Sequence, residues 1–150
     1  MNVHQTIITL AAAGIAVVAQ NFLMVRITES VSTVLVALVI NSSVGLILLL
    51  AALLLRNGLS GVSEAIGAVT PWAVLPGLLG SFFVFAGVIG YQKVGAASTV
   101  AVLVASQLIA GLLADAYRAG PNFGSRISPL SWLGAALLLA GSVLVAHRQG

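Results

Sequence analysis

Long uncharged stretches are the feature of this sequence that most narrows what the chain can fold into. Five of them follow one another, each free of Asp, Glu, Lys and Arg and rich in Ala, Val, Leu and Ile. A bilayer core about 30 Å thick needs roughly 20 apolar residues per helix. We therefore expect five transmembrane helices, over about residues 5–25, 31–55, 73–92, 96–114 and 132–146.

The overall composition supports the same class. Hydrophobic residues make up 60% of the 150 residues and charged residues 6%, whereas soluble domains carry about 25% charged residues. The first five residues contain no Lys or Arg, and the apolar run continues past Ala19, which indicates a permanent first helix rather than a cleaved signal. The prediction is an all-α integral membrane protein, with residues 1–150 forming a single membrane domain.

Several functional classes are excluded by what the sequence lacks. There are no cysteines, so disulfides, zinc–thiolate sites and cysteine nucleophiles are ruled out. The net charge of +3 is too small and too scattered to predict nucleic-acid binding. His4 and His147 are terminal, and we find no pattern for a metal site, a cofactor or a catalytic group. We therefore do not expect this protein to be an enzyme.

The connections between the stretches are short and polar. Arg56-Asn57-Gly58 combines a charge with helix-stopping residues. The following segment, 58–71, has apolar residues at helical spacing and predicts a short helix lying in the membrane interface. We expect Trp72, which follows this segment, to lie at the level of the lipid headgroups. A second polar connection, 119–131, precedes the last stretch.

The basic residues are balanced across the predicted membrane. With five spans the two chain ends lie on opposite sides, and each side carries three basic residues: Arg56, Arg118 and Arg126 on one, Arg26, Lys93 and Arg148 on the other. Orientation normally follows an excess of Lys and Arg in cytoplasmic loops. Equal numbers arise by chance in a chain with few charges, or they indicate dual topology, in which two copies pair antiparallel around a two-fold axis in the membrane plane.

Polar side chains inside the spans are the candidates for binding a solute. Each needs a hydrogen-bond partner in hydrocarbon, which a neighbouring helix or a solute supplies. Interhelical bonding explains any one of them, but together they exceed what packing requires. We expect substrate-binding residues at Gln20, Asn21, Asn41, Tyr91, Ser106 and Gln107, with the four amides lining a central cavity.

Small residues mark the faces on which membrane helices pack. Gly77, Gly80 and Gly87 give the third span an unusual glycine content, which predicts packing and a hinge there. No span holds a mid-membrane carboxylate of the kind common in proton-coupled carriers. Asp115, at the expected end of the fourth span, is either a water-facing helix-end residue near Arg118 or a titrating coupling site.

Four segments of this sequence closely resemble the bacterial YdcZ-like family, part of the drug/metabolite transporter superfamily. They are Gln20-Asn21-Phe22-Leu23-Met24-Val25-Arg26, Pro76-Gly77-Leu78-Leu79-Gly80-Ser81-Phe82-Phe83-Val84, Val94-Gly95-Ala96-Ala97 and Val104-Ala105-Ser106-Gln107-Leu108-Ile109. The resemblance covers nearly the whole chain. It implies a multi-pass transport protein of the bacterial inner membrane, without a settled substrate.

A broader likeness concerns the end of the chain. Leu113-Ala114-Asp115 followed by Leu133–Gly141 looks like the ending of the EamA-type repeat, whose full-length members have two inverted five-helix repeats. This chain is similar to one such repeat. Small multidrug resistance proteins are similar in principle, but they use a carboxylate in the first helix where this sequence has Gln20-Asn21, so their proton exchange is not carried over.

These observations leave three hypotheses. The leading one is a secondary transporter of a small polar solute, neutral or anionic rather than a cation, working by alternating access as an antiparallel homodimer in the lipid bilayer. The second is a dual-topology dimeric ion channel, and the third a structural or regulatory membrane subunit without a solute path. A second small membrane protein as partner, in place of a second copy, also fits the sequence.

Overall fold

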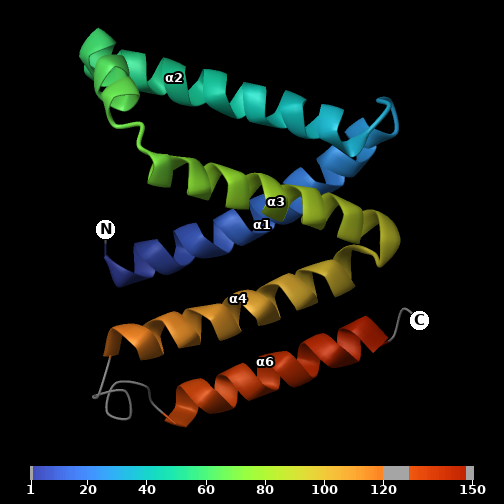
Figure 1. The fold of residues 1–150 in the computed structure, drawn as a ribbon. Helices are drawn as coiled ribbons and strands as arrows, with labels where there is room; N and C mark the ends of the chain where they lie inside the picture. The colour runs from blue at the N-terminus through green and yellow to red at the C-terminus, as the bar shows by residue number, and fades with distance from the viewer. Residues whose placement is uncertain (1, 120–128, 148–150) are drawn as a thin grey trace. The chain divides into compact units, whose positions relative to one another are not determined.

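The computed structural model describes residues 2–119 and 129–147, which form five helices (Figure 1). These are α1 (Val3–Thr28), α2 (Val34–Gly67), α3 (Pro71–Lys93), α4 (Ala96–Ala119) and α6 (Pro129–His147). The first four are long and apolar enough to cross a membrane, while the apolar part of α6, Trp132–Ala146, is shorter. The predicted all-α membrane class with about five helices is confirmed. Arg126 and Arg148, counted in the charge balance, lie outside the described residues.

Several helices extend beyond the predicted spans. Helix α1 continues through Arg26 to Thr28, and α4 passes Asp115 and ends at Ala119. A charged side chain ends an apolar stretch but leaves the backbone free to continue its i to i−4 hydrogen bonds. The hydropathy pattern therefore located the apolar segments, whereas the helix ends lie up to about a turn beyond them.

Helix α2 breaks at Gly58, as the stop signal predicted. Gly58 has φ 62° and ψ −158°, a backbone conformation that is essentially confined to glycine. Helical structure resumes after it and continues to Gly67. The predicted short helix after residue 58 is thus present as the last part of α2, and its position in the membrane interface stays a prediction.

The chain divides into two compact units, of which unit 1 comprises Met1–Ile89. Its core has one fully buried residue from each helix, Met24 of α1, Ala37 of α2 and Val88 of α3. Val84 and Leu38 are among the partly buried side chains that pack against them. In Figure 1, α3 crosses α1 in this unit. The small Ala37 side chain allows α2 to approach closely, as small residues do in membrane helix pairs.

Unit 2 comprises Gly90–Gly150, and its helices α4 and α6 lie side by side (Figure 1). Ala105 and Ala135 are buried. A hollow of about 170 Å³ between these helices is lined only by apolar side chains, among them Ile109, Trp132 and Leu139. The turn before α4 needs a glycine, because Gly95 has φ 81°, a value that other residues rarely adopt.

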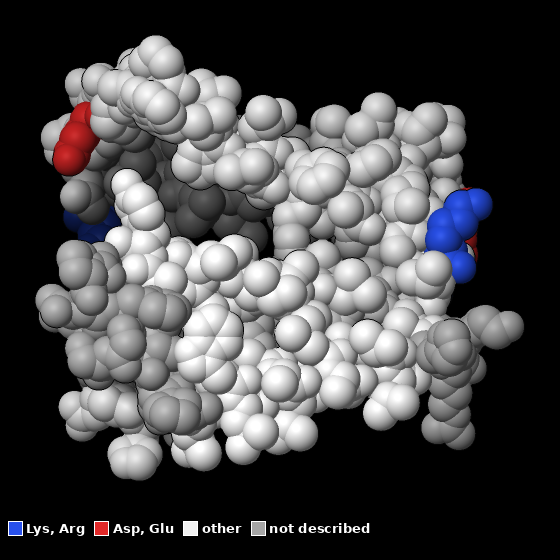
Figure 2. Space-filling view, turned by 60° about the horizontal axis from the view of Figure 1, so that its bottom comes forward, with Lys and Arg blue, Asp and Glu red and all other residues white. Residues whose placement is uncertain are grey.

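Most large apolar side chains point away from these cores. Leu55 is 90% exposed and Trp72 78% exposed, a distribution that suits lipid as the surrounding solvent because lipid tails are as apolar as Leu. Figure 2 shows how few Lys, Arg, Asp and Glu side chains reach the face in view. An exposed apolar surface with few charges is the surface expected of a membrane-embedded chain.

Candidate functional site

Two of the predicted polar residues meet in the middle of unit 1. The Gln20 Nε2 group of α1 donates a hydrogen bond to Asn41 Oδ1 of α2, at 3.2 Å, in a partly buried position. Gln20 lies four residues before Met24, and Asn41 four residues after Ala37. The core pair Met24–Ala37 and the amide pair Gln20–Asn41 are therefore successive layers of one antiparallel helix pair.

The neighbouring residue Asn21 is oriented toward a different helix. Its side chain is 5% exposed, and a Cβ atom built on Gly87 of α3 would lie 3.2 Å from its Oδ1. Successive residues of a helix point about 100° apart, so Gln20 reaches α2 while Asn21 reaches α3. We call Gln20, Asn21 and Asn41 the amide level.

Asn21 differs from its neighbours in how its amide is satisfied. It makes no hydrogen bond to another residue in the described part of the chain. The residue as a whole is buried, but its amide oxygen and nitrogen are not among the fully buried side-chain atoms that lack a partner in the described part of the chain. Gly87 matters here, since any side chain at that position would press on the amide. The predicted packing role of Gly87 is thus a close approach to Asn21.

Gly77 and Gly80 lie in open space. A Cβ built on either would meet nothing within 4 Å. Pro76 precedes them inside α3, and a proline there removes one backbone hydrogen bond of the helix. The hinge predicted for this part of α3 stays a prediction, now with Pro76 as an additional weak point.

The remaining predicted site residues belong to unit 2. Tyr91 is 8% exposed, Gln107 is exposed on α4, and Ser106 Oγ donates to the Leu103 carbonyl at 2.9 Å. Ser98, which the sequence analysis did not single out, is 3% exposed and its Oγ has no partner. Participation of Tyr91, Ser106 and Gln107 in one site with the amide level stays a prediction.

A groove in unit 1 carries hydroxyl groups at mid-span. It has a volume of about 470 Å³ and is lined by Ser42 and Ser43 of α2, Ser81 of α3 and four apolar side chains. Ser42 and Ser43 stand out in the sequence beside Asn41, but Ser81 is a single polar residue in an apolar helix. The fold places these serines of α2 and α3 in the lining of one groove.

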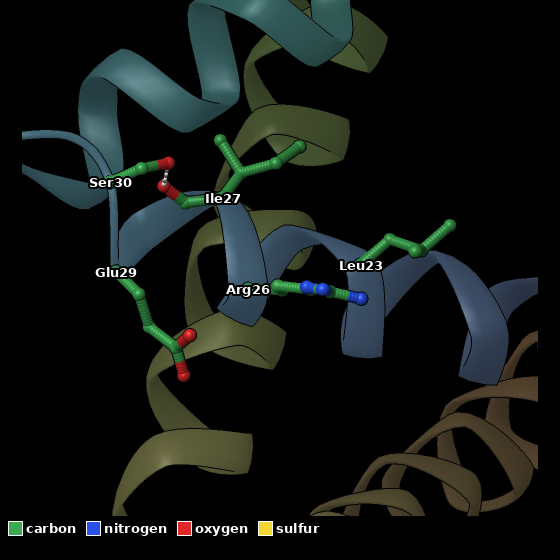
Figure 3. A pocket seen from close by; sticks show the side chains of 5 residues that line it. All are labelled: Leu23, Arg26, Ile27, Glu29 and Ser30. Carbon is green, nitrogen blue, oxygen red and sulfur yellow. Dashed lines mark hydrogen bonds between the residues drawn. The ribbon is translucent and has the colours of Figure 1, made fainter.

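A second hollow of about 560 Å³ lies at the end of α1 (Figure 3). Arg26 and Glu29 line it together with Leu23, Ile27 and Ser30. The Ser30 hydroxyl donates to the Ile27 carbonyl at 2.9 Å. Opposite charges thus face one open hollow just past the uncharged part of α1.

Asp115 is exposed on α4, one turn before the helix ends at Ala119. The sequence placed it at the helix end, and the helix continues past it. Among the described residues, no group of three or more His, Cys, Asp or Glu side chains could hold a metal ion. The role of Asp115 in coupling stays a prediction.

Comparison with known proteins identifies the family of this chain. The sequence profile of the family described as "Putative inner membrane exporter, YdcZ" matches residues 5–144. The chain is 50% identical over 150 residues to the protein named "Inner membrane protein YdcZ" of Escherichia coli (strain K12), covering 99% of each chain. No solved structure matches.

The match includes all five helices and the amide level. The relative is an inner-membrane protein by its name, the description of the family names an exporter and no enzyme, and the helices of this chain are long and apolar enough for a multi-pass protein. This chain is a multi-pass inner-membrane protein, and it belongs to the YdcZ family of the drug/metabolite transporter superfamily.

Proposed function

We propose that this chain is a secondary transporter that moves a small polar solute across the inner membrane by alternating access, as an antiparallel homodimer. The observation that carries the proposal is the amide level. Polar residues within spans are costly and mark solute pathways. Here the Gln20–Asn41 bond and the buried Asn21 lie between uncharged helices.

The family supports transport as the activity. Its description names an exporter, and outward transport is the direction we propose. Because no described residue of the spans is Asp, Glu, Lys or Arg near the amide level, recognition in this site relies on hydrogen bonds. A solute that bonds to these amides exchanges its hydrogen bonds to water for hydrogen bonds to the protein, at a depth where the membrane offers no water.

The balance of basic residues supports the antiparallel homodimer. Each predicted side of the membrane carries three Lys or Arg, so neither orientation is favoured. Two copies inserted in opposite directions are related by an axis in the membrane plane, the symmetry of inverted-repeat transporters. Alternating access then follows from one copy rocking against the other, with Gln107 of each copy as a further predicted substrate contact.

Topology is the first test of this assembly. A reporter fused to the C-terminus is expected on both sides of the membrane in comparable amounts. Arg118→Gln removes a basic residue from the N-terminal side and should shift the C-terminus toward the cytoplasm, while Lys93→Gln should shift it the other way. A single orientation that neither variant moves would rule out the antiparallel homodimer and favour a different small membrane protein as partner.

Transport itself is tested with the purified chain in liposomes. A carrier exchanges labelled for unlabelled solute, whereas an ion channel conducts much faster and shows no exchange. Asn41→Leu and Gln107→Leu are expected to abolish the exchange. Unchanged function in both variants would favour a structural or regulatory subunit.

A further inference from the structure

We infer that the amide level binds an uncharged solute in which a hydrogen-bond donor and an acceptor lie side by side on one edge. Lactams, ureas and nucleobases have such an edge. This inference rests on the proposed function and names the substrate class of the same site. It is drawn from what the Gln20–Asn41 bond leaves unused.

A carboxamide offers two N–H donors and a carbonyl oxygen with two lone pairs. The bond between Gln20 and Asn41 uses one N–H of Gln20 and one lone pair of Asn41. Gln20 Oε1 remains as an acceptor, and the Asn41 NH₂ group remains as a donor. The oxygen and nitrogen of an amide can be assigned either way. If both amides are turned over, Asn41 donates to Gln20, and the unused acceptor and donor exchange places. One N–H of Gln20 and one lone pair of Asn41 also remain, so the pair presents both acceptors and donors from two facing helices.

Both residues are only partly buried, and in the proposed complex these unused groups are the ones that meet the ligand. A cis-amide edge complements them, because its N–H can donate to Gln20 while its carbonyl accepts from Asn41. A solute with acceptors alone would satisfy Asn41 and leave Gln20 Oε1 without a donor. An unmatched group of this kind is what lets a polar site reject an analogue.

Asn21 adds an independent reason to expect a polar ligand. The residue is 5% exposed, and its amide has no hydrogen-bond partner in the described part of the chain. Gly87 contributes no side chain that could fill the space beside it, and a Cβ there would already lie 3.2 Å from Oδ1. A ligand hydrogen bond would give this amide a partner, which stabilises the bound state.

The charge of the ligand follows from the surroundings. Residues 3–25 of α1, 34–55 of α2 and 71–92 of α3 contain no Asp, Glu, Lys or Arg. An ion moved into such a site loses its hydration without gaining a counter-charge, which is far more costly than moving a neutral amide. Anions and cations are both disfavoured, and this narrows the solute to the neutral class.

Binding of uracil tests the inference directly. The full-length chain in lipid nanodiscs would be titrated with uracil, with 1,3-dimethyluracil, which lacks both N–H donors, and with orotate, which adds a carboxylate. Ligand-observed NMR detects weak binding of such small probes. Uracil is expected to bind about tenfold more tightly than either analogue, the loss expected for an unmatched hydrogen bond.

Variants locate the site. Gln20→Met and Asn41→Leu remove one amide each at nearly constant volume and should weaken uracil binding about five- to tenfold. Gln5→Met removes an exposed amide from the same helix, whose Oε1 accepts from the Asn2 backbone N–H, and should leave binding unchanged. The exchange Q20N/N41Q keeps both amides and should retain binding.

Each outcome separates the inference from the proposed function. Equal affinity for uracil and 1,3-dimethyluracil, or no binding of uracil, would overturn the inference even if a variant failed to fold. If the inference fails in this way, exchange of a different solute in liposomes would still support the proposed transporter. The expected binding pattern without any solute exchange would support the inference and overturn the transporter.

Discussion

The two units of this chain hold their helices together in different ways. In unit 1 the contact among α1, α2 and α3 is built from Met24, Ala37 and Val88, with an amide pair one turn away. In unit 2 one close approach is between small groups: a Cβ on Gly90 would lie 2.6 Å from Thr99 Cγ2. The Thr99 hydroxyl is satisfied within its own segment, donating to the Gly95 carbonyl at 2.7 Å.

The difference bears on where a solute can bind. Unit 1 combines unused amide groups with a serine-lined groove, whereas the hollow in unit 2 is entirely apolar. The buried Ser98 hydroxyl of unit 2 lies outside that apolar hollow, while the amide pair of unit 1 keeps unused donors and acceptors. We therefore expect unit 2 to tolerate changes in polarity better than changes in volume, and unit 1 the reverse.

The largest effect is expected at Gly90 in unit 2. Gly90→Val places a branched side chain where even a Cβ would overlap Thr99, and overpacking of this kind costs about 3 kcal/mol. Thermal unfolding in detergent measures it. Gly80→Val, at a position on α3 with nothing within 4 Å, is the control. Equal losses of stability in the two variants would contradict the close contact.

A smaller effect is expected at Gly58 in unit 1. Alanine does not tolerate φ 62° and ψ −158°, so Gly58→Ala should cost about 2 kcal/mol or straighten α2. Gly67→Ala, near the end of the same helix and free of nearby atoms, should be nearly neutral. Unfolding measurements on the two variants decide whether the bend depends on glycine, and equal stability would contradict it.

The amide pair should contribute a small coupling energy. A double-mutant cycle of Gln20→Met and Asn41→Leu isolates it, and hydrogen bonds between membrane helices average about 0.6 kcal/mol. Stability of the two single variants and the double variant supplies the measurement. Fully additive losses would mean that the two side chains do not interact, and the contrast between the units would lose its basis.

The smallest effect is expected at Asp115. The side chain is exposed on α4, and surface substitutions usually stay within about 0.5 kcal/mol. Asp115→Asn should therefore leave stability and solute exchange unchanged at every pH tested, with Glu64→Gln as the matched exposed control. Loss of the pH dependence of exchange in Asp115→Asn alone would instead assign a coupling role to this carboxylate.

The sequence predicted the helices and the break at Gly58, because membrane helices and glycine stops follow from local composition. It did not predict which amides pair. Gln20 could bond to any facing polar group, and only the register set by Met24 against Ala37 brings Asn41 opposite to it. Ser81 was missed for the same reason, since a single serine acquires meaning only beside Ser42 and Ser43.

The short link between α3 and α4 has a consequence for how the protein is made. Only Val94 and Gly95 separate Lys93 from Ala96, and two residues cannot cross a bilayer. The end of α3 and the start of α4 must therefore lie on one side of the membrane, with Lys93 there and Arg118 near the opposite end of α4. In the antiparallel homodimer proposed above, this pair would be inserted in both directions, and its orientation would depend on the segments made before and after it.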